Sequence, residues 1–273
     1  MISRNRSKLF EKIINYSKLT IMYHGYSQID NSWGKTDTNV NLPLLYNKLY
    51  FIESGEGTEV MPTGKVNLKK NHAYLFPLKT KYNYFTDSYI RHFFIHFNFS
   101  LYNFLDIFDL YKLKTYEIKY DFNKAFKILS KYDNNNIIDK LYIKSFLIQI
   151  LLKFVDKNIK IDVKKFSFLE KYKDIIDYIN NNLGNDLTLE KIAEQALLTP
   201  AYLSYSFKHD LGINIKQYIN DKIVEKAANL LITTSKKVKE ISRELHFSDE
   251  FYFSKFFKKY TFSSPGKYRK NHD

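Results

Sequence analysis

The sequence predicts an α+β protein with two domains, the first rich in strands and the second all helical. In residues 20–99, turn residues separate short apolar segments, and in some of these apolar and polar residues alternate as they do in strands. From residue 168 onward, apolar residues recur at the spacing of one helix face. Between the two regions lies Lys157–Ser167, which is polar and weakly patterned. We therefore expect one domain over residues 1–160 and a second over 168–273.

Composition favours a globular cytoplasmic protein. The chain has 273 residues, of which 44% are hydrophobic, enough to form a core in each domain. Cysteine is absent, which excludes disulfides and thiolate metal sites. Charged and polar residues interrupt every apolar run, so we expect neither a signal peptide nor a membrane span.

The first half predicts a small barrel or sandwich followed by a pair of helices. Short strands are separated by a cluster of glycine and proline between Gly55 and Gly64. Helical periodicity then appears in residues 122–132 and 137–155. The apolar stripe of the second helix, within Asp139–Val155, predicts packing on the sheet, on a second copy of the chain, or on both.

The second half contains one pattern twice. "LEKIAEQALL" precedes "TPAYLSYSFK", and "VKEISRELHF" precedes "DEFYFSKFFK", with the second segments matching at an offset of 50. Each copy reads as a short amphipathic helix, a tight turn and another helix, the pattern of a helix-turn-helix. Expected helices are 168–182, 188–197, 200–210, 215–231, 238–245 and 249–260, with Ser248 as the cap of the last.

The outward positions of the two second helices predict DNA contacts. Small, hydroxyl and basic side chains suit base edges and phosphates in a major groove. The formal net charge of +14 also favours a polyanionic partner, although the chain from Phe168 onward has a net charge of only +3. We expect bases to be read by Ser204, Tyr205, Phe251, Ser254 and Lys255, and phosphates to be held by Lys208, Lys258 and Lys259, with Ala201 and Glu250 completing the outward faces.

Residues Leu187–Arg269 resemble the DNA-binding region of the AraC family of bacterial transcription regulators. The resemblance rests on the duplicated pattern, on "FSKFFKK", and on the tail residues Pro265, Tyr268 and Arg269. It implies a regulator that binds double-stranded promoter DNA and contacts RNA polymerase; the family expectation is an activator, and a repressor is the alternative. The apolar stripe of residues 139–155 predicts that the regulator is a homodimer. This chain departs from the family pattern at His246 and Phe262, where glycine is common, at Ile223, where arginine is common, and at Ser242, where alanine is usual.

The first half resembles the cupin-like barrel that precedes the DNA-binding region in many members of this family. The segments that carry the resemblance are "LYFIESGEG", "AYLFPLKTKYNY" and "RHFFIHF". The resemblance implies a small-molecule effector such as a sugar. Side chains that it places around the effector are Trp33, Tyr82, Tyr84, His92, Phe94 and His96. The alternative is that these aromatic residues form plain core.

Two other functions compete with an effector-responsive regulator. The first is a cupin-type metal-dependent enzyme, but the His-x-His pair and following Glu of such sites are missing, and His92 and His96 lack a clear third ligand. We therefore expect no catalytic residues, no metal and no cofactor. The second is an architectural DNA-binding protein without an effector. Bound metal would indicate the enzyme, and effector-dependent DNA affinity the regulator.

Overall fold

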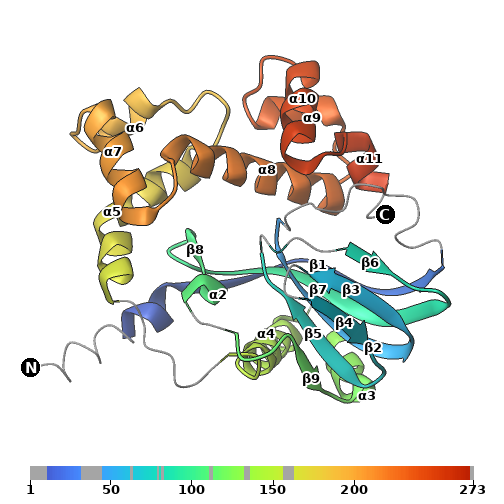
Figure 1. Ribbon diagram of the computed structural model, residues 1–273. Coiled ribbons are helices and arrows are strands. Elements are labelled where there is room, and N and C mark those ends of the chain that lie inside the picture. The colour runs from blue at the N-terminus through green and yellow to red at the C-terminus, as the bar shows by residue number, and fades with distance from the viewer. Residues whose placement is uncertain are drawn as a thin grey trace, which may run out of the picture. The chain divides into compact units, whose positions relative to one another are not determined.

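The computed structural model describes residues 11–31, 45–61, 64–78, 80, 83–110, 113–131, 136–155 and 163–270. The chain divides into two compact units (Figure 1). The sheet unit comprises the described residues of Lys18–Phe99 and Asp106–Lys160, and the helical unit those of Met1–Ser17, Ser100–Leu105 and Ile161–Asp273. None of the helices in the described ranges is long and apolar enough to cross a membrane.

Two sheets form the sheet unit. Six strands make the larger one, in the order β1-β7-β2-β5-β9 with β8 paired to β7, and three make the smaller, in the order β4-β3-β6. The strands are β1 Ser17–Asp30, β2 Asn47–Gly55, β3 Gly57–Met61, β4 Gly64–Leu68, β5 His72–Phe76, β6 Asn83–Phe85, β7 Tyr89–Leu101, β8 Leu105–Asp106 and β9 Glu117–Lys119. The central strand β2 pairs antiparallel with both β5 and β7, so both of its edges are hydrogen-bonded within the sheet. Its side chains point alternately to the two faces of the sheet.

Strand alternation divides the larger sheet into two faces. On one face, Leu49 and Phe51 of β2 belong to a core cluster with Phe93, Ile95 and other apolar residues. The opposite face places Tyr50 and Ile52 in a second cluster together with residues of β4, β5 and β7. The antiparallel register therefore produces two separate cores.

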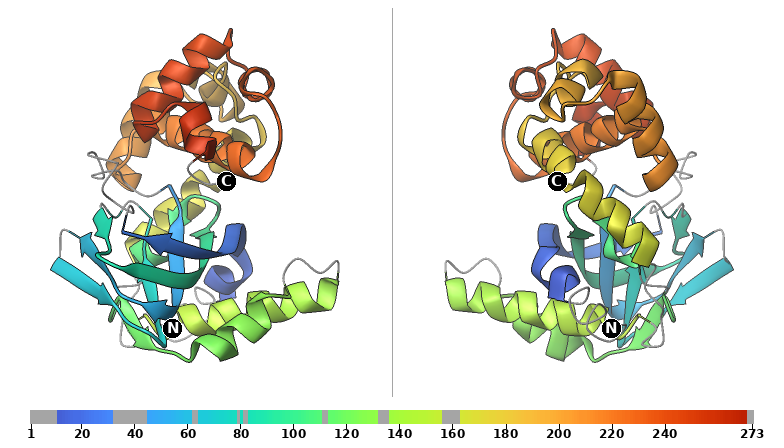
Figure 2. Two further views of the ribbon diagram at one scale, coloured as in Figure 1. Left: turned by 90° about the vertical axis from the view of Figure 1, so that its right-hand side faces the viewer. Right: turned by 90° about the vertical axis from the view of Figure 1, so that its left-hand side faces the viewer.

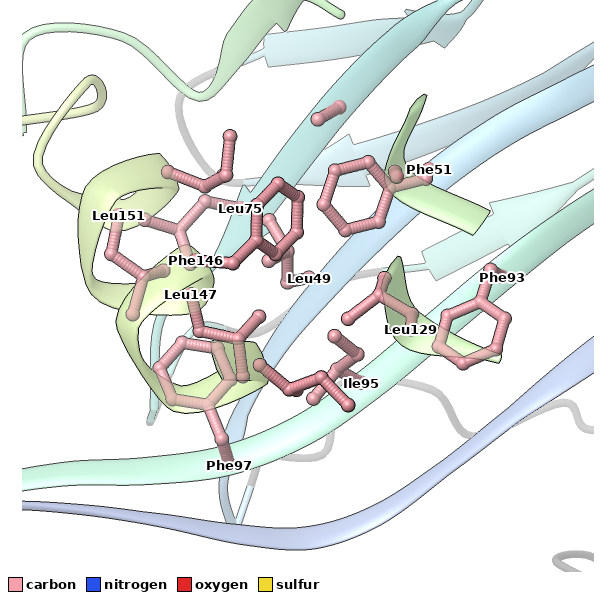
Figure 3. Packing of buried hydrophobic residues seen from close by; sticks show 14 of the residues in the cluster. Leu49, Phe51, Leu75, Phe93, Ile95, Phe97, Leu129, Phe146, Leu147 and Leu151 are labelled. Carbon is pink, nitrogen blue, oxygen red and sulfur yellow. The ribbon is translucent and has the colours of Figure 1, made fainter. Parts of the chain in front are cut away.

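Two helices cover the first of these faces. The helices α3 (Phe122–Leu129) and α4 (Ile137–Leu151) follow a short α2 (Ile107–Leu110), and side chains of Asp121 and Asn136 cap their first amides. Figure 2 shows α3 and α4 together beside the sheet. Leu129, Phe146, Leu147 and Leu151 point from the two helices onto Leu49, Leu75 and Ile95 of the strands (Figure 3). Each such buried side chain stabilises the unit by about 1.5–3 kcal/mol.

The helical unit contains the seven helices α5 to α11 in its described part after residue 162. These are α5 Val163–Asn181, α6 Leu189–Gln195, α7 Pro200–Leu211, α8 Ile215–Thr233, α9 Val238–Glu244, α10 Glu250–Thr261 and α11 Pro265–Lys270. Cap side chains from Thr188, Thr199 and Asn214 fix the starts of α6, α7 and α8. In Figure 1, α8 runs from the α6–α7 pair to the group formed by α9, α10 and α11.

The helices of the helical unit differ from the sequence prediction at several places. Helix α10 is capped by Asp249 and not by Ser248, because one carboxylate oxygen of Asp249 accepts hydrogen bonds from the next two free amides, at 2.8 and 2.7 Å. Helix α5 begins at Val163, inside the segment that the sequence predicted to be a linker. The short helix α11 was not predicted, and its proline lies at the first helical position, where the missing N–H costs nothing.

Two short segments from the first half of the chain pack within the helical unit. The ring of Tyr102 stacks on Tyr16 at 4.6 Å between centroids. Next to it in sequence, Phe104 packs against Tyr218 of α8 at 4.8 Å and against Phe207 of α7 at 5.8 Å. The turn between β7 and β8 therefore contributes an aromatic side chain to the core of the helical unit.

Candidate nucleic-acid interface and effector site

The turns inside the two helix-turn-helix copies have the same backbone conformation. Leu197 and His246, 49 positions apart, both adopt a left-handed conformation, with φ of 54° and 58°. The same two hydrogen bonds close each turn: Leu197 N to Glu194 O and Leu198 N to Ala193 O in the first, and His246 N to Arg243 O and Phe247 N to Ser242 O in the second. The first bond of each pair spans four residues and the second spans six. Bonds of this kind end a helix sharply and let the next one cross it.

The second turn is one residue longer than the first. Helix α7 begins three residues after Leu197, whereas α10 begins four residues after His246. Corresponding residues of the two copies are therefore 49 positions apart in the first helix of each copy and 50 positions apart in the second helix. The extra residue also explains why the cap of α10 is Asp249.

The inner faces of α7 and α10 dock these helices on the rest of the unit. Leu203 and Phe207 of α7 are fully buried, and so are Phe253 and Phe257 of α10. The side chain of Tyr252, on the same helix, is 48% exposed and lies outside this buried face. The docking face of α10 is thus narrower than its aromatic content suggests.

The outer faces of α7 and α10 present the predicted DNA contacts. Tyr205 is 71% exposed and Phe251 is 74% exposed, although large aromatic side chains are usually covered. Ala201, Lys208, Lys255, Lys258 and Lys259 are also exposed, whereas Ser204, Glu250 and Ser254 are partly buried. The ten residues therefore lie on two helices of one unit, with apolar and basic side chains mixed on each outer face.

Helix α8 is fastened to the second copy at two places. The side-chain amide of Asn220 donates a hydrogen bond to the hydroxyl of Tyr260, at 2.7 Å. Near the end of α8, the guanidinium of Arg269 donates to the carbonyl oxygens of Leu231, at 2.8 Å, and Lys236, at 2.6 Å. The tail arginine thus satisfies carbonyls that the helix end leaves without an intrahelical partner.

A cleft of about 690 Å³ lies between the two helix-turn-helix copies. Its floor is formed by α8, and its walls include Ser204 of α7 and Phe256 and Lys259 of α10. Two of the predicted DNA contacts, Ser204 and Lys259, therefore line opposite sides of the same cleft.

In the sheet unit, three of the six predicted effector contacts share a sheet face. His92, Phe94 and His96 stand opposite Ile52, Tyr50 and Lys48 in the register of β7 and β2. Both histidines are buried, and burial lowers the pKa of His92 to about 4, so this imidazole is neutral near pH 7. Trp33 and Tyr82 lie outside the described residues, and Tyr84 is in β6, with only its backbone described.

Two charged residues lie next to this face and were not predicted as effector contacts from the sequence. Lys48 lies on the same face of β2 as Tyr50, and the loss of hydration lowers its pKa to about 8. Glu59 of the smaller sheet is fully buried, and burial raises the pKa of its carboxyl well above the usual range. Neither carboxylate oxygen of Glu59 has a hydrogen-bond partner among the described residues. The only signal in the sequence was a lysine at an alternating position of an apolar strand.

His, Asp and Glu side chains do not gather in threes that could hold a metal ion anywhere in the described ranges. The two histidines of β7 are flanked by aromatic rings instead. Tyr50 lies 4.7 Å from His92 and Tyr46 lies 4.4 Å from His96, measured between ring centroids.

Comparison with known proteins decides what the helical unit is. Residues 192–271 match the family model described as "Helix-turn-helix domain". The lactose operon transcription activator of Staphylococcus xylosus is 31% identical over 156 residues, which cover 57% of this chain and 56% of that protein. The arabinose operon regulatory protein of Salmonella typhimurium is 32% identical over 100 residues, 36% of either chain.

Residues 192–271 form a helix-turn-helix domain of the AraC type. The chain spans only about a third to a half of the length of these curated relatives. Over 93% of its length the chain is similar in fold to ToxT of Vibrio cholerae in its unsaturated fatty acid-bound structure, with a TM-score of 0.53, 16% identity and coverage of 94% of that chain.

The two positions where glycine was expected have the backbone conformation that glycine favours. His246 and Phe262 both adopt left-handed conformations, with φ of 58° and 57°. A left-handed residue other than glycine costs roughly 1 kcal/mol or more, so both positions are strained. His246 gains a contact in return, because its Nδ1 lies 2.7 Å from Oδ1 of Asp186.

Proposed function

We propose that the chain is a transcription regulator that inserts α7 and α10 into successive major grooves of promoter DNA. The observation that carries this proposal is the pair of AraC-type helix-turn-helix motifs, each with an exposed aromatic and basic outer face, on one connecting helix. In this proposal residues 168–273 bind DNA, while residues 1–160 bind an effector and form a homodimer. The regulator acts in the bacterial cytoplasm, and the family resemblance favours activation through RNA polymerase.

Base reading and phosphate binding are assigned to different side chains. Tyr205 and Phe251 are largely exposed on the two helices and suit contact with thymine methyl groups, while Lys255 suits the acceptors of guanine. Lys208 and Lys258 lie in the last turns of α7 and α10, where they suit phosphate oxygens.

Salt titrations of DNA affinity test this assignment. The duplex is one that the full chain selects from a random library. We expect Lys258→Ala to weaken selected and scrambled duplexes alike and to reduce the slope of log K against log salt by about one. Lys255→Ala is expected to cost about 1–3 kcal/mol on the selected duplex and much less on a scrambled one.

The control is Lys65→Ala, which removes an exposed lysine from β4 of the sheet unit. It should leave both the affinity and the salt slope unchanged. If Lys255→Ala left the affinity for the selected duplex unchanged, base reading by Lys255 would be wrong.

We also propose that the two sheets form a cupin-like barrel whose interior binds a small effector beside Glu59. Burying a carboxylate without a hydrogen bond is costly, so a ligand that donates hydrogen bonds there is bound favourably. Sugar hydroxyls are such donors, and the neighbouring Lys48 and aromatic rings suit a polar ring-shaped ligand. Because a ToxT structure holds an unsaturated fatty acid, fatty acids are the second class of effector to screen.

A thermal-shift screen of sugars and fatty acids tests the effector proposal. We expect a sugar to raise the unfolding temperature of the wild type and to raise that of Glu59→Gln much less. Without ligand, the glutamine variant should be at least as stable, because a neutral amide costs less to bury than a carboxylate. Glu56→Ala, which removes an exposed carboxylate three residues away, is the control. An equal shift in Glu59→Gln and wild type would overturn this site.

A further inference from the structure

The two helix-turn-helix copies contact each other directly, in addition to their connection through α8. The loop before α6, at Gly184–Asp186, meets the turn between α9 and α10, at Leu245–His246. The backbone amide of Asn185 donates a hydrogen bond to the carbonyl of Leu245, at 2.8 Å. Beside it, the imidazole of His246 pairs with the carboxylate of Asp186.

The contact is close enough to restrict which residues can form it. A Cβ atom added to Gly184 would lie 2.7 Å from Nδ1 of His246, a distance that real side chains do not tolerate. The hydrogen bond from His246 is also the main reason that the pKa of Asp186 lies below its usual value. Gly184 and Asn185 line the cleft between the two copies as well, so the contact lies at the edge of that cleft.

The equivalent turn of the first copy provides a comparison. Leu197 has the same left-handed backbone as His246, yet its side chain is 93% exposed. The strain at the two turns is therefore alike, whereas the contact between the copies is found at His246. A comparison of variants at Leu197 and His246 can therefore separate the effect of the strained backbone from the effect of the imidazole contact.

We propose that the contact between Gly184–Asp186 and Leu245–His246 fixes the separation of α7 and α10 and thereby selects the spacing between the two DNA half-sites. Helix α8 is already joined to the second copy by Asn220–Tyr260 and by Arg269, which bonds the carbonyls of Leu231 and Lys236. The contact at Gly184–Asp186 adds a direct link between the copies at the edge of the cleft, closes a ring through both copies and restricts how far α10 can move relative to α7. His246 and Asp186 are thus positioning residues, and the inference rests on the proposed DNA-binding function.

Affinity for duplexes of different spacing tests the inference. The full chain first selects a duplex from a random library, and the two half-sites of that duplex are then separated by one base pair fewer, one more and two more. We expect the wild type to prefer a single spacing. In His246→Gly and Asp186→Ala the ratio of affinities between the best and the neighbouring spacings should fall by about two- to fivefold, the range expected for one exposed ion pair.

Leu197→Gly is the matched control, since it relieves the same backbone strain without touching the contact. Its spacing ratio should equal that of the wild type, and thermal unfolding of each variant checks that it folds. The double variant His246→Gly/Asp186→Ala should show the ratio of either single variant.

Three results would overturn the inference: an unchanged spacing ratio in both His246→Gly and Asp186→Ala, an equal fall in Leu197→Gly, or additive losses in the double variant. A wild type that selects no sequence from the library would instead overturn the proposed function.

Discussion

Ser242 limits the stability of the second helix-turn-helix. It occupies the place that Ala193 has in the first copy, and both residues are 1% exposed. The hydroxyl of Ser242 has no hydrogen-bond partner among the described residues. Burying a donor without a partner lowers the stability of the fold by about 1–3 kcal/mol, whereas the methyl group of alanine has no hydrogen-bonding group to leave unpaired.

We therefore expect Ser242→Ala to raise the free energy of unfolding by about 1 kcal/mol, measured by urea titration. The reciprocal change, Ala193→Ser, provides the control and should lower it by a similar amount. A Ser242→Ala variant less stable than the wild type would show that the hydroxyl has a favourable partner.

At the scale of elements, α4 is apolar on two sides. Ile143, Leu147 and Ile150 face the sheet, while Leu141 and Tyr142 are 56% and 70% exposed. A helix that is apolar on opposite faces needs a partner for each. Together with the family resemblance, this favours a second copy of the chain on the exposed face.

Sedimentation tests this dimer proposal. The wild type should sediment as a dimer at micromolar concentration, and Leu141→Glu should shift it toward monomer because the glutamate would lose its hydration in the interface. Lys127→Glu, a charge change on the exposed side of α3, should leave the dimer intact. A monomeric wild type would contradict the proposal.

Helix starts that depend on neighbouring residues were predictable from the sequence, whereas features that depend on tertiary contacts were not. Thr199 and Pro200 mark the start of α7, and the predicted helix differs from the observed one by a single residue at its end. For α10 the predicted cap was Ser248, whereas the cap in the structure is the adjacent Asp249, because the path of the preceding turn decides which amides a side chain reaches. Glu59 is fully buried in β3, which pairs with β4 and β6, and it lies near Lys48 of β2, so its environment depends on contacts between strands that no local pattern reveals.

In the whole molecule, the proposed function requires both helix-turn-helix copies to bind one DNA site. Recognition helices in successive major grooves of one face lie about one helical turn, roughly 34 Å, apart. Lysine and aromatic side chains are not needed in equal number on the two recognition helices, because phosphate contacts position each helix and base contacts add the sequence preference.

Hydroxyl-radical footprinting of the selected duplex tests this claim most directly. The account predicts two protected segments on the same face of the DNA, about 10 base pairs apart, for each bound domain. It also predicts that Tyr205→Ala weakens protection of one segment and Phe251→Ala that of the other. A single protected segment, unaffected by Phe251→Ala, would contradict the account.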